Sequence, residues 1–125
     1  MAAIVPTVTD VSAKADGSAL LYVWSPVTSA GSDTCVAAML PDHVDKSIHV
    51  SGTFGGASVA VNGSNNGGAS YAALNDPFGN VIAITSEKIK AVRENTVYTQ
   101  PAATGGSGQT LKISMLFLLR NPLRT

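Results

Sequence analysis

Residues 47–76, SIHVSGTFGGASVAVNGSNNGGASYAALND, decide the fold class of this 125-residue chain. Apolar residues fall at every second position in residues 48–51 and again in residues 57–61, which is the period of a strand with one buried face. Dense glycine and asparagine separate these runs, and such residues suit turns because they tolerate positive φ. The stretch therefore predicts a β meander whose strands are joined by hairpins.

Further strand-like runs lie on both sides of this stretch. They are residues 19–27, 33–40, 70–74, 80–85 and 110–120. Residues 86–95 fit either a short helical turn or a charged edge strand, and Pro101 makes residues 97–104 an irregular or edge strand. Eight or so short strands without a convincing long helix predict an all-β protein, an antiparallel β-sandwich with a jelly-roll-like arrangement.

The length of the chain and its turn signals predict one domain with a leading arm. A chain of 125 residues is too short for two ordinary domains. Residues 1–17 lack a clear period and end in the turn signal Asp16-Gly17. We therefore expect an extended N-terminal arm over residues 1–17 and a single β-sandwich domain over residues 18–125.

Charge and hydropathy argue against two classes of partner. Eight basic and eight acidic residues give a net charge of zero, which does not favour binding to nucleic acid. The longest wholly apolar run, Met115 to Leu119, is far shorter than the roughly 18 residues of a membrane-spanning helix. Residues 1–17 have no basic start, so no signal peptide is expected, and the sequon Asn62-Gly63-Ser64 is interpreted only as a turn.

No set of residues has the pattern of a catalytic site, so we expect no enzyme activity and no catalytic residue. Cys35 is the only cysteine and lies in an apolar run, which favours a buried structural role over that of a thiol nucleophile. No GxSxG nucleophile motif is present. Trp24, the only tryptophan, lies in an apolar run and is expected in the core, with a sugar-stacking platform as the alternative.

One charged segment has the residue types of a metal site. Asp42, His43 and Asp45 lie close together, and His49 follows on the polar face of the next strand. No second cluster with ligand spacing accompanies them, and isolated Asp and His residues in loops are normally solvated. We therefore expect no metal and no other cofactor.

In the last strand-like run, residues 110–120, the pattern of apolar residues changes along the strand. Residues 110–114 alternate, whereas the following residues are apolar on both faces, so one face needs a cover outside its own core. The cover is either the N-terminal arm or another copy of the chain, and self-association as a dimer or trimer is the natural hypothesis. The predicted oligomer interface comprises Met115, Leu116, Phe117, Leu118 and Leu119.

Several short motifs resemble a family of small tailed-bacteriophage head proteins that decorate or cement the capsid. The resemblance covers residues 24–120, about three quarters of the chain, and it depends on six segments. They are residues 39–42 (MLPD), 46–50 (KSIHV), 52–57 (GTFGGA), 63–67 (GSNNG), 74–80 (LNDPFGN) and 105–108 (GGSG). It implies a β-sandwich on the outer surface of a virion, made in the host cytoplasm, that binds the major capsid protein.

The glycine-rich loops indicate which residues would contact a capsid, and the resemblance leaves one alternative function open. The expected capsid contacts are loop residues with short or accessible groups, namely Thr53, Phe54, Asn65, Asn66 and Ser107. The chain departs from the pattern at Tyr71, where such sequences often have tryptophan, and discoidin-like sugar-binding sandwiches share similar features. A carbohydrate-binding module on a phage head or tail, with a glycan as partner, is therefore the alternative function.

Overall fold

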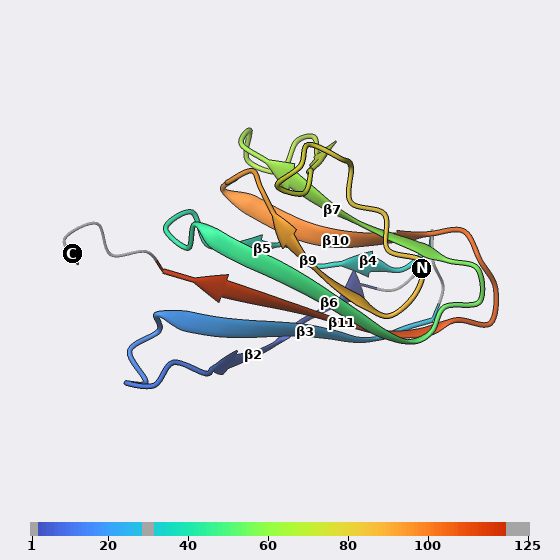
Figure 1. Cartoon of the computed structure of the whole chain (residues 1–125), viewed down its shortest axis with the longest axis horizontal. Helices are drawn as coiled ribbons and strands as arrows, with labels where there is room; N and C mark the ends of the chain where they lie inside the picture. Colours follow the sequence, from blue (N-terminus) through green and yellow to red (C-terminus); the bar gives the residue numbers. More distant parts are fainter. Residues whose placement is uncertain (1–2, 29–31, 120–125) are drawn as a thin grey trace.

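A computed structural model describes residues 3–28 and 32–119, and within these residues every regular element is a strand (Figure 1). The strands are β1 (Ala3–Ile4), β2 (Thr7–Asp10), β3 (Ala19–Val27), β4 (Thr34–Cys35), β5 (Ala38–Met39), β6 (Asp45–Thr53), β7 (Ser58–Ser64), β8 (Ala72–Ala73), β9 (Lys88–Val92), β10 (Tyr98–Thr104) and β11 (Thr110–Leu118). None of the described residues belongs to a helix that is long and apolar enough to cross a membrane.

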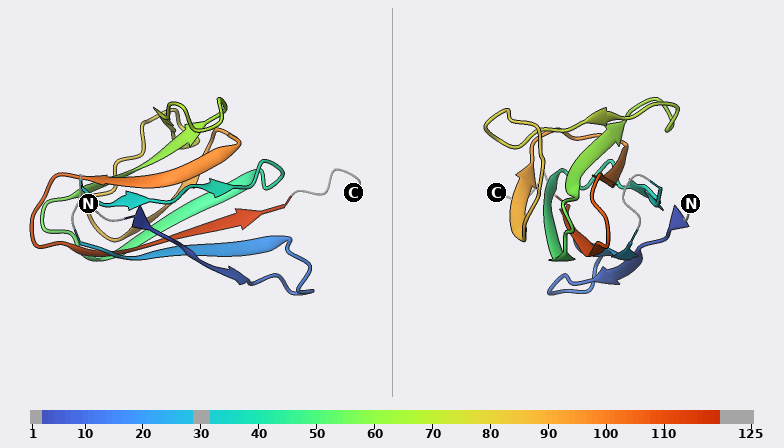
Figure 2. Two further views of the ribbon diagram at one scale, coloured as in Figure 1. Left: turned by 180° about the vertical axis from the view of Figure 1, so that it is seen from behind. Right: turned by 90° about the vertical axis from the view of Figure 1, so that its right-hand side faces the viewer.

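The strands form two antiparallel sheets that pack face to face. One sheet has the order β2-β3-β11-β6-β9 and the other has the order β5-β10-β7-β8. A short parallel pair, β1 with β4, lies beside them. The right-hand view of Figure 2 shows β9 on one side of the molecule and the β1–β4 pair on the other. The prediction of an all-β sandwich is confirmed.

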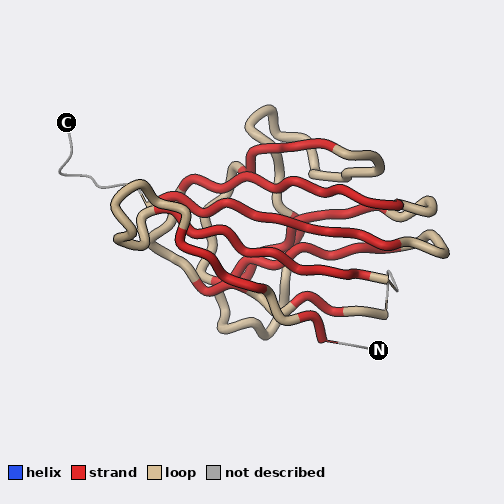
Figure 3. Tube along the Cα trace, turned by 90° about the horizontal axis from the view of Figure 1, so that it is seen from below, coloured by secondary structure: helices blue, strands red, loops and turns tan. Residues whose placement is uncertain are grey.

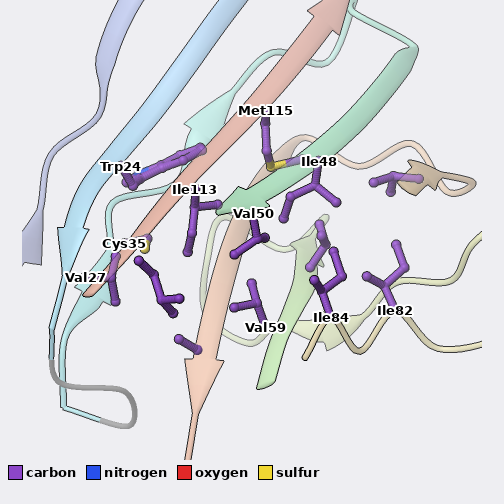
Figure 4. Close-up of a cluster of buried hydrophobic side chains, with 14 of the residues drawn as sticks. Trp24, Val27, Cys35, Ile48, Val50, Val59, Ile82, Ile84, Ile113 and Met115 are labelled. Atoms are coloured by element: carbon purple, nitrogen blue, oxygen red, sulfur yellow. The ribbon is translucent and has the colours of Figure 1, made fainter. Parts of the chain in front are cut away.

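Period-two alternation explains how the two sheets make one core. In β6 the side chains of Lys46, Ile48 and Val50 are buried, and the residues between them are half-buried. Met115 enters the same core from β11, the neighbour of β6, and Trp24 enters it from β3, on the other side of β11 (Figure 4). Full burial of an aliphatic side chain contributes roughly 1.5–3 kcal/mol, so alternation in the long strands supplies the main stabilising term.

The first join of the predicted meander is not a hairpin. β6 lies in the five-stranded sheet and β7 in the four-stranded sheet, so residues 54–57 cross from one sheet to the other. Residues 105–109 make the same crossing between β10 and β11, and the two loops lie side by side at one end of the molecule (Figure 3). We call residues 52–57 and 104–109 together the corner. The alternation is correct for each strand, but it carries no information on which sheet a strand joins.

The second join is a hairpin, as the sequence predicts. β7 pairs antiparallel with β8, with Asn62 opposite Ala73 and Gly63 opposite Ala72. β8 itself is only two residues long, and the predicted strand at residues 80–85 is reduced to two isolated bridges, Asn75 with Val81 and Val59 with Ile84.

Pro101 lies in an inner strand rather than an edge strand. β10 lies between β5 and β7, and Pro101 is opposite Val61. On its other side, β5 pairs only with Tyr98 and Thr99. The missing amide hydrogen of Pro101 therefore costs no ladder bond on that side, because β5 has already ended.

The structure also decides how residues 33–40 and residues 86–95 are arranged. The predicted strand at residues 33–40 is divided into β4 and β5, which join different sheets. Residues 86–95 contain β9, the edge of the five-stranded sheet, so the charged edge strand is the correct alternative there. In the N-terminal segment, β2 pairs with β3 as the opposite edge of that sheet.

Candidate binding surfaces

Cys35, considered as a nucleophile, and Trp24, considered as a sugar-stacking ring, are both buried. Cys35 is 3% exposed, and burial raises the pKa of its thiol to about 12, so it stays protonated and unreactive at neutral pH. Trp24 is fully buried, and its Nε1 donates a hydrogen bond of 2.9 Å to the carbonyl oxygen of Val36. The ring of Trp24 is therefore not accessible to a sugar, and the stacking alternative is wrong.

The histidines of the charged segment have separate partners. Nε2 of His43 lies 2.9 Å from the carbonyl oxygen of Gly17, whereas Nε2 of His49 lies 3.0 Å from Oε2 of Glu87. Within residues 3–28 and 32–119, no three or more His, Cys, Asp or Glu residues gather as metal ligands would.

The predicted oligomer interface divides between two faces of β11. Met115 and Phe117 are 0% and 1% exposed and pack in the core. Leu116 lies on the outer face of the sheet, opposite Leu21 of β3 and Ser47 of β6. Leu118 and Leu119 are exposed. Because β2 pairs alongside β3 within the sheet, it does not lie over this outer face, and only Leu116, Leu118 and Leu119 are available to a second copy.

The predicted capsid contacts lie at opposite ends of the four-stranded sheet. Thr53, Phe54 and Ser107 belong to the corner, where the backbone N–H of Ser107 donates to the carbonyl oxygen of Gly55 at 2.9 Å. Asn65 and Asn66 follow the other end of β7. All of these residues are exposed except Phe54, which packs against the core.

Large apolar side chains are exposed along two opposite edges of the sandwich, a feature that the local sequence pattern does not predict. The β9 edge carries Phe78, Val81 and Ile89, which are 90%, 59% and 65% exposed. Phe78 and Ile89 line one groove of about 300 Å³ with Asp76 and Lys90. The amine of Lys90 and the Asp76 carboxylate are 3.4 Å apart and form an ion pair at this edge.

The opposite edge, which we call the β5 edge, carries Val5, Val36 and Met39. These side chains are 73%, 41% and 58% exposed. The N–H of Val36 donates to the carbonyl oxygen of Ile4, so Val5 and Val36 come from adjoining segments. The sequence signal at both edges is ambiguous, because Phe78 falls in a turn pattern and Met39 falls in an apolar run that resembles a core strand.

A larger groove of about 580 Å³ lies at the end of β7 that is remote from the corner. It is lined by Asn65 and Tyr71 from the β7–β8 turn and by Glu94 and Asn95 from the segment between β9 and β10. Both carboxylate oxygens of Glu94 accept hydrogen bonds from Asn75, at 2.7 Å from its backbone N and 2.9 Å from its Nδ2. These bonds hold the pKa of Glu94 below its usual value, so the side chain is a carboxylate at neutral pH.

A buried amine lies behind this groove. Nζ of Lys46 donates a hydrogen bond of 2.7 Å to Oδ1 of Asn95. Burial lowers the pKa of Lys46, and the negative charges of Asp45 and Glu94 act in the opposite direction. The Lys46 amine therefore contacts a residue of the groove, Asn95, without lining the groove itself.

No protein-family model matches this chain, and no curated protein matches it either.

Proposed function

We propose that this protein is a structural virion protein that decorates an icosahedral phage capsid and stabilises it by binding neighbouring major capsid subunits. The observation that carries the proposal is the pair of apolar edges on opposite sides of one small sandwich. Single exposed apolar residues are ordinary, but groups of large ones mark surfaces that another macromolecule covers. Two such groups on opposite edges suit a protein that holds two neighbours together.

The nature of each edge favours protein partners. Phe78 is almost fully exposed at a turn that three hydrogen bonds to Asp76 hold in place, from Gly79 N to its carbonyl oxygen and from Phe78 N and Asn80 N to its Oδ1. An aromatic side chain on a rigid turn loses little conformational freedom when it enters a pocket of a partner. Met39 at the other edge has an adaptable side chain that fits irregular surfaces.

The strand order and the motif resemblance also support a virion protein. The order β3-β11-β6-β9 over β5-β10-β7-β8 supports a jelly-roll description, and jelly rolls occur in viral capsid domains and in lectins. Because one fold hosts many functions, the fold alone decides nothing, and the edges carry the argument. The place of action in this proposal is the outer surface of the capsid.

The proposal separates attachment from stabilisation, and an experiment with capsid shells that lack this protein tests both. The β9-edge variant is Phe78→Ser with Ile89→Ser, the β5-edge variant is Val5→Ser with Met39→Ser, and a third variant combines all four changes. Val8→Ser, an apolar-to-polar change at a 48% exposed position of β2 that belongs to neither group of edge residues, is the matched control.

Each single-edge variant should still co-sediment with shells but should no longer raise the temperature at which the shells open. The four-change variant should not co-sediment, and the control should behave as the wild type, because a ligand stabilises an assembly only through the contacts it makes. Full stabilisation by the four-change variant would refute the role of the edges, and wild-type protein that never binds shells would refute the function itself.

Self-association is a separate part of the proposal. We expect a dimer or trimer that covers the outer face of β11, so Leu116→Lys with Leu118→Lys should shift the protein towards monomer in light scattering. Each leucine buried at the contact contributes roughly 1.5–3 kcal/mol, and the core face of β11 is untouched by the change. Wild-type protein that remains monomeric at high concentration would contradict this expectation.

A further inference from the structure

We infer that the groove between Asn65, Tyr71, Glu94 and Asn95 binds an uncharged saccharide. The inference does not depend on capsid binding, since it concerns a different surface from the two apolar edges. Its volume, about 580 Å³, falls within the roughly 300–1,000 Å³ of small-molecule sites.

The groove is lined by both apolar and polar groups. Ala72, Ala73 and Leu74 from β8 and the residue after it line it, and Tyr71 adds an aromatic ring with a hydroxyl. The hydroxyl of Tyr71 has no hydrogen-bond partner among the described residues. A pyranose has an apolar face of C–H groups and a rim of hydroxyls, so a surface of this composition complements it.

Internal hydrogen bonds orient the two asparagines at the walls. The backbone N–H of Val97 donates to Oδ1 of Asn65 at 2.9 Å, and the Lys46 amine donates to Oδ1 of Asn95 at 2.7 Å. Because these partners can only donate, the oxygen of each amide is identified by chemistry and the Nδ2 group is the remaining end. Within the described part of the chain, neither Nδ2 group has a partner, so both are donors available to a ligand.

The turn that carries Asn65 and Tyr71 is rigid before any ligand arrives. Oγ of Ser64 donates to Oδ1 of Asn66 at 2.7 Å, and Nδ2 of Asn66 donates to Oγ of Ser70 at 2.8 Å. The N–H of Gly68 donates to Oγ of Ser64 at 3.1 Å. A site held in place by such bonds loses little entropy on binding, which favours even a small ligand.

Electrostatics select against acidic sugars. Glu94 is a carboxylate held by Asn75, and it can accept further hydrogen bonds from hydroxyls of a neutral sugar. A ligand carboxylate in the same groove would face like charge at short range. Lys46 does not line the groove, and its amine is hydrogen-bonded to Oδ1 of Asn95.

Nuclear magnetic resonance titration of the isotope-labelled full-length protein tests this inference with four probes: D-glucose, D-galactose, N-acetyl-D-glucosamine and D-glucuronate. At least one neutral sugar should give saturable shifts confined to backbone amides of residues 63–75 and 94–96. D-Glucuronate should bind more weakly than that sugar.

Three variants remove one donor each without removing the internal bonds. Asn65→Asp and Asn95→Asp keep the oxygen that accepts from Val97 or Lys46 but lose Nδ2, and Tyr71→Phe loses only the hydroxyl. Each should weaken binding roughly two- to tenfold, the effect of one neutral hydrogen bond. Thr85→Asp, at an exposed loop position after Ile84, is the control for added charge and should bind as the wild type.

Saturable neutral-sugar shifts that are reduced by these variants would support the inference. It is overturned if no neutral sugar gives saturable shifts, if the shifts lie elsewhere, if D-glucuronate binds as tightly, or if all three variants bind as the wild type. Tyr71→Phe adds no charge, so it gives a result even if an aspartate variant fails to fold. The titration contains no capsid shells, so a negative result would not contradict the proposal that the protein binds a capsid.

Discussion

The two ends of β7 look alike in the sequence but are built differently. GTFGGA at residues 52–57 leads into β7 at the corner, and GSNNGG at residues 63–68 leads out of it. At the corner, neighbouring backbone occupies the space of a glycine side chain. At the other end, Gly67 at the turn tip has open space around it, and serine and asparagine side chains hold the turn with hydrogen bonds.

Close backbone approach explains the corner. A Cβ atom on Gly55 would lie 2.1 Å from the carbonyl oxygen of Ser107, and one on Gly52 would lie 2.2 Å from that of Thr110. Both distances are far below van der Waals contact, so only glycine allows the crossing loops to touch at Gly55 and β6 to approach β11 at Gly52. At Gly67, by contrast, an added Cβ would meet nothing within 4 Å. Glycine-rich sequence therefore has two physical meanings, close packing and a permissive turn.

The largest expected effect is a matched pair of alanine substitutions. Gly55→Ala should lower the free energy of unfolding by roughly 3–5 kcal/mol, because either the β6–β7 or the β10–β11 loop must move. Gly67→Ala should cost only about 1 kcal/mol, the price of a positive φ for alanine. Urea denaturation of both variants measures the difference. Equal losses would mean that the corner is not tightly packed.

The second pair removes a hydroxyl from each end. The Ser64 hydroxyl is buried and bonds to Asn66 and to the N–H of Gly68, so Ser64→Ala should cost about 1–3 kcal/mol. Ser107 is exposed and joins the corner through its backbone, so Ser107→Ala should change stability by less than about 0.5 kcal/mol. Thermal unfolding of the two variants tests this, and a larger loss in Ser107→Ala would reverse the comparison.

The smallest effect concerns pH. The folded-state pKa of Glu94 lies below the usual value of 4.5, so its contribution to stability is complete above that pH and is lost as pH falls through the folded value. Its side chain is 32% exposed, and solvent screening limits the contribution to at most about 1 kcal/mol. Between pH 7 and pH 3, Glu94→Gln should therefore lose less stability than the wild type in urea denaturation.

The corner provides the control for that pH measurement. Residues 52–57 and 104–109 contain no titratable side chain, so Gly55→Ala should keep the wild-type dependence on pH while being less stable throughout. If Glu94→Gln shows the same slope as the wild type, the hydrogen bonds from Asn75 do not depend on the charge of Glu94.

Local pattern predicts the strands better than it predicts their partners. Alternation in β6, β7 and β11 identifies the buried faces, since period two is a property of a single strand. The sheet switch at Phe54 and the inner position of Pro101 depend on contacts distant in sequence, which no local pattern contains. The same limit applies to the edges, because the exposure of Phe78 and Met39 follows from where the sheets end. The groove could not be predicted either, because Asn65 and Asn95 are distant in sequence and line the same groove only in the folded chain.

A density map of assembled virions tests the central proposal most directly. It should show many copies of this sandwich on the outer surface at junctions between major capsid subunits, with the β9 edge on one subunit and the β5 edge on its neighbour. Particles without the protein, or with only a few copies located at the tail, would contradict the account.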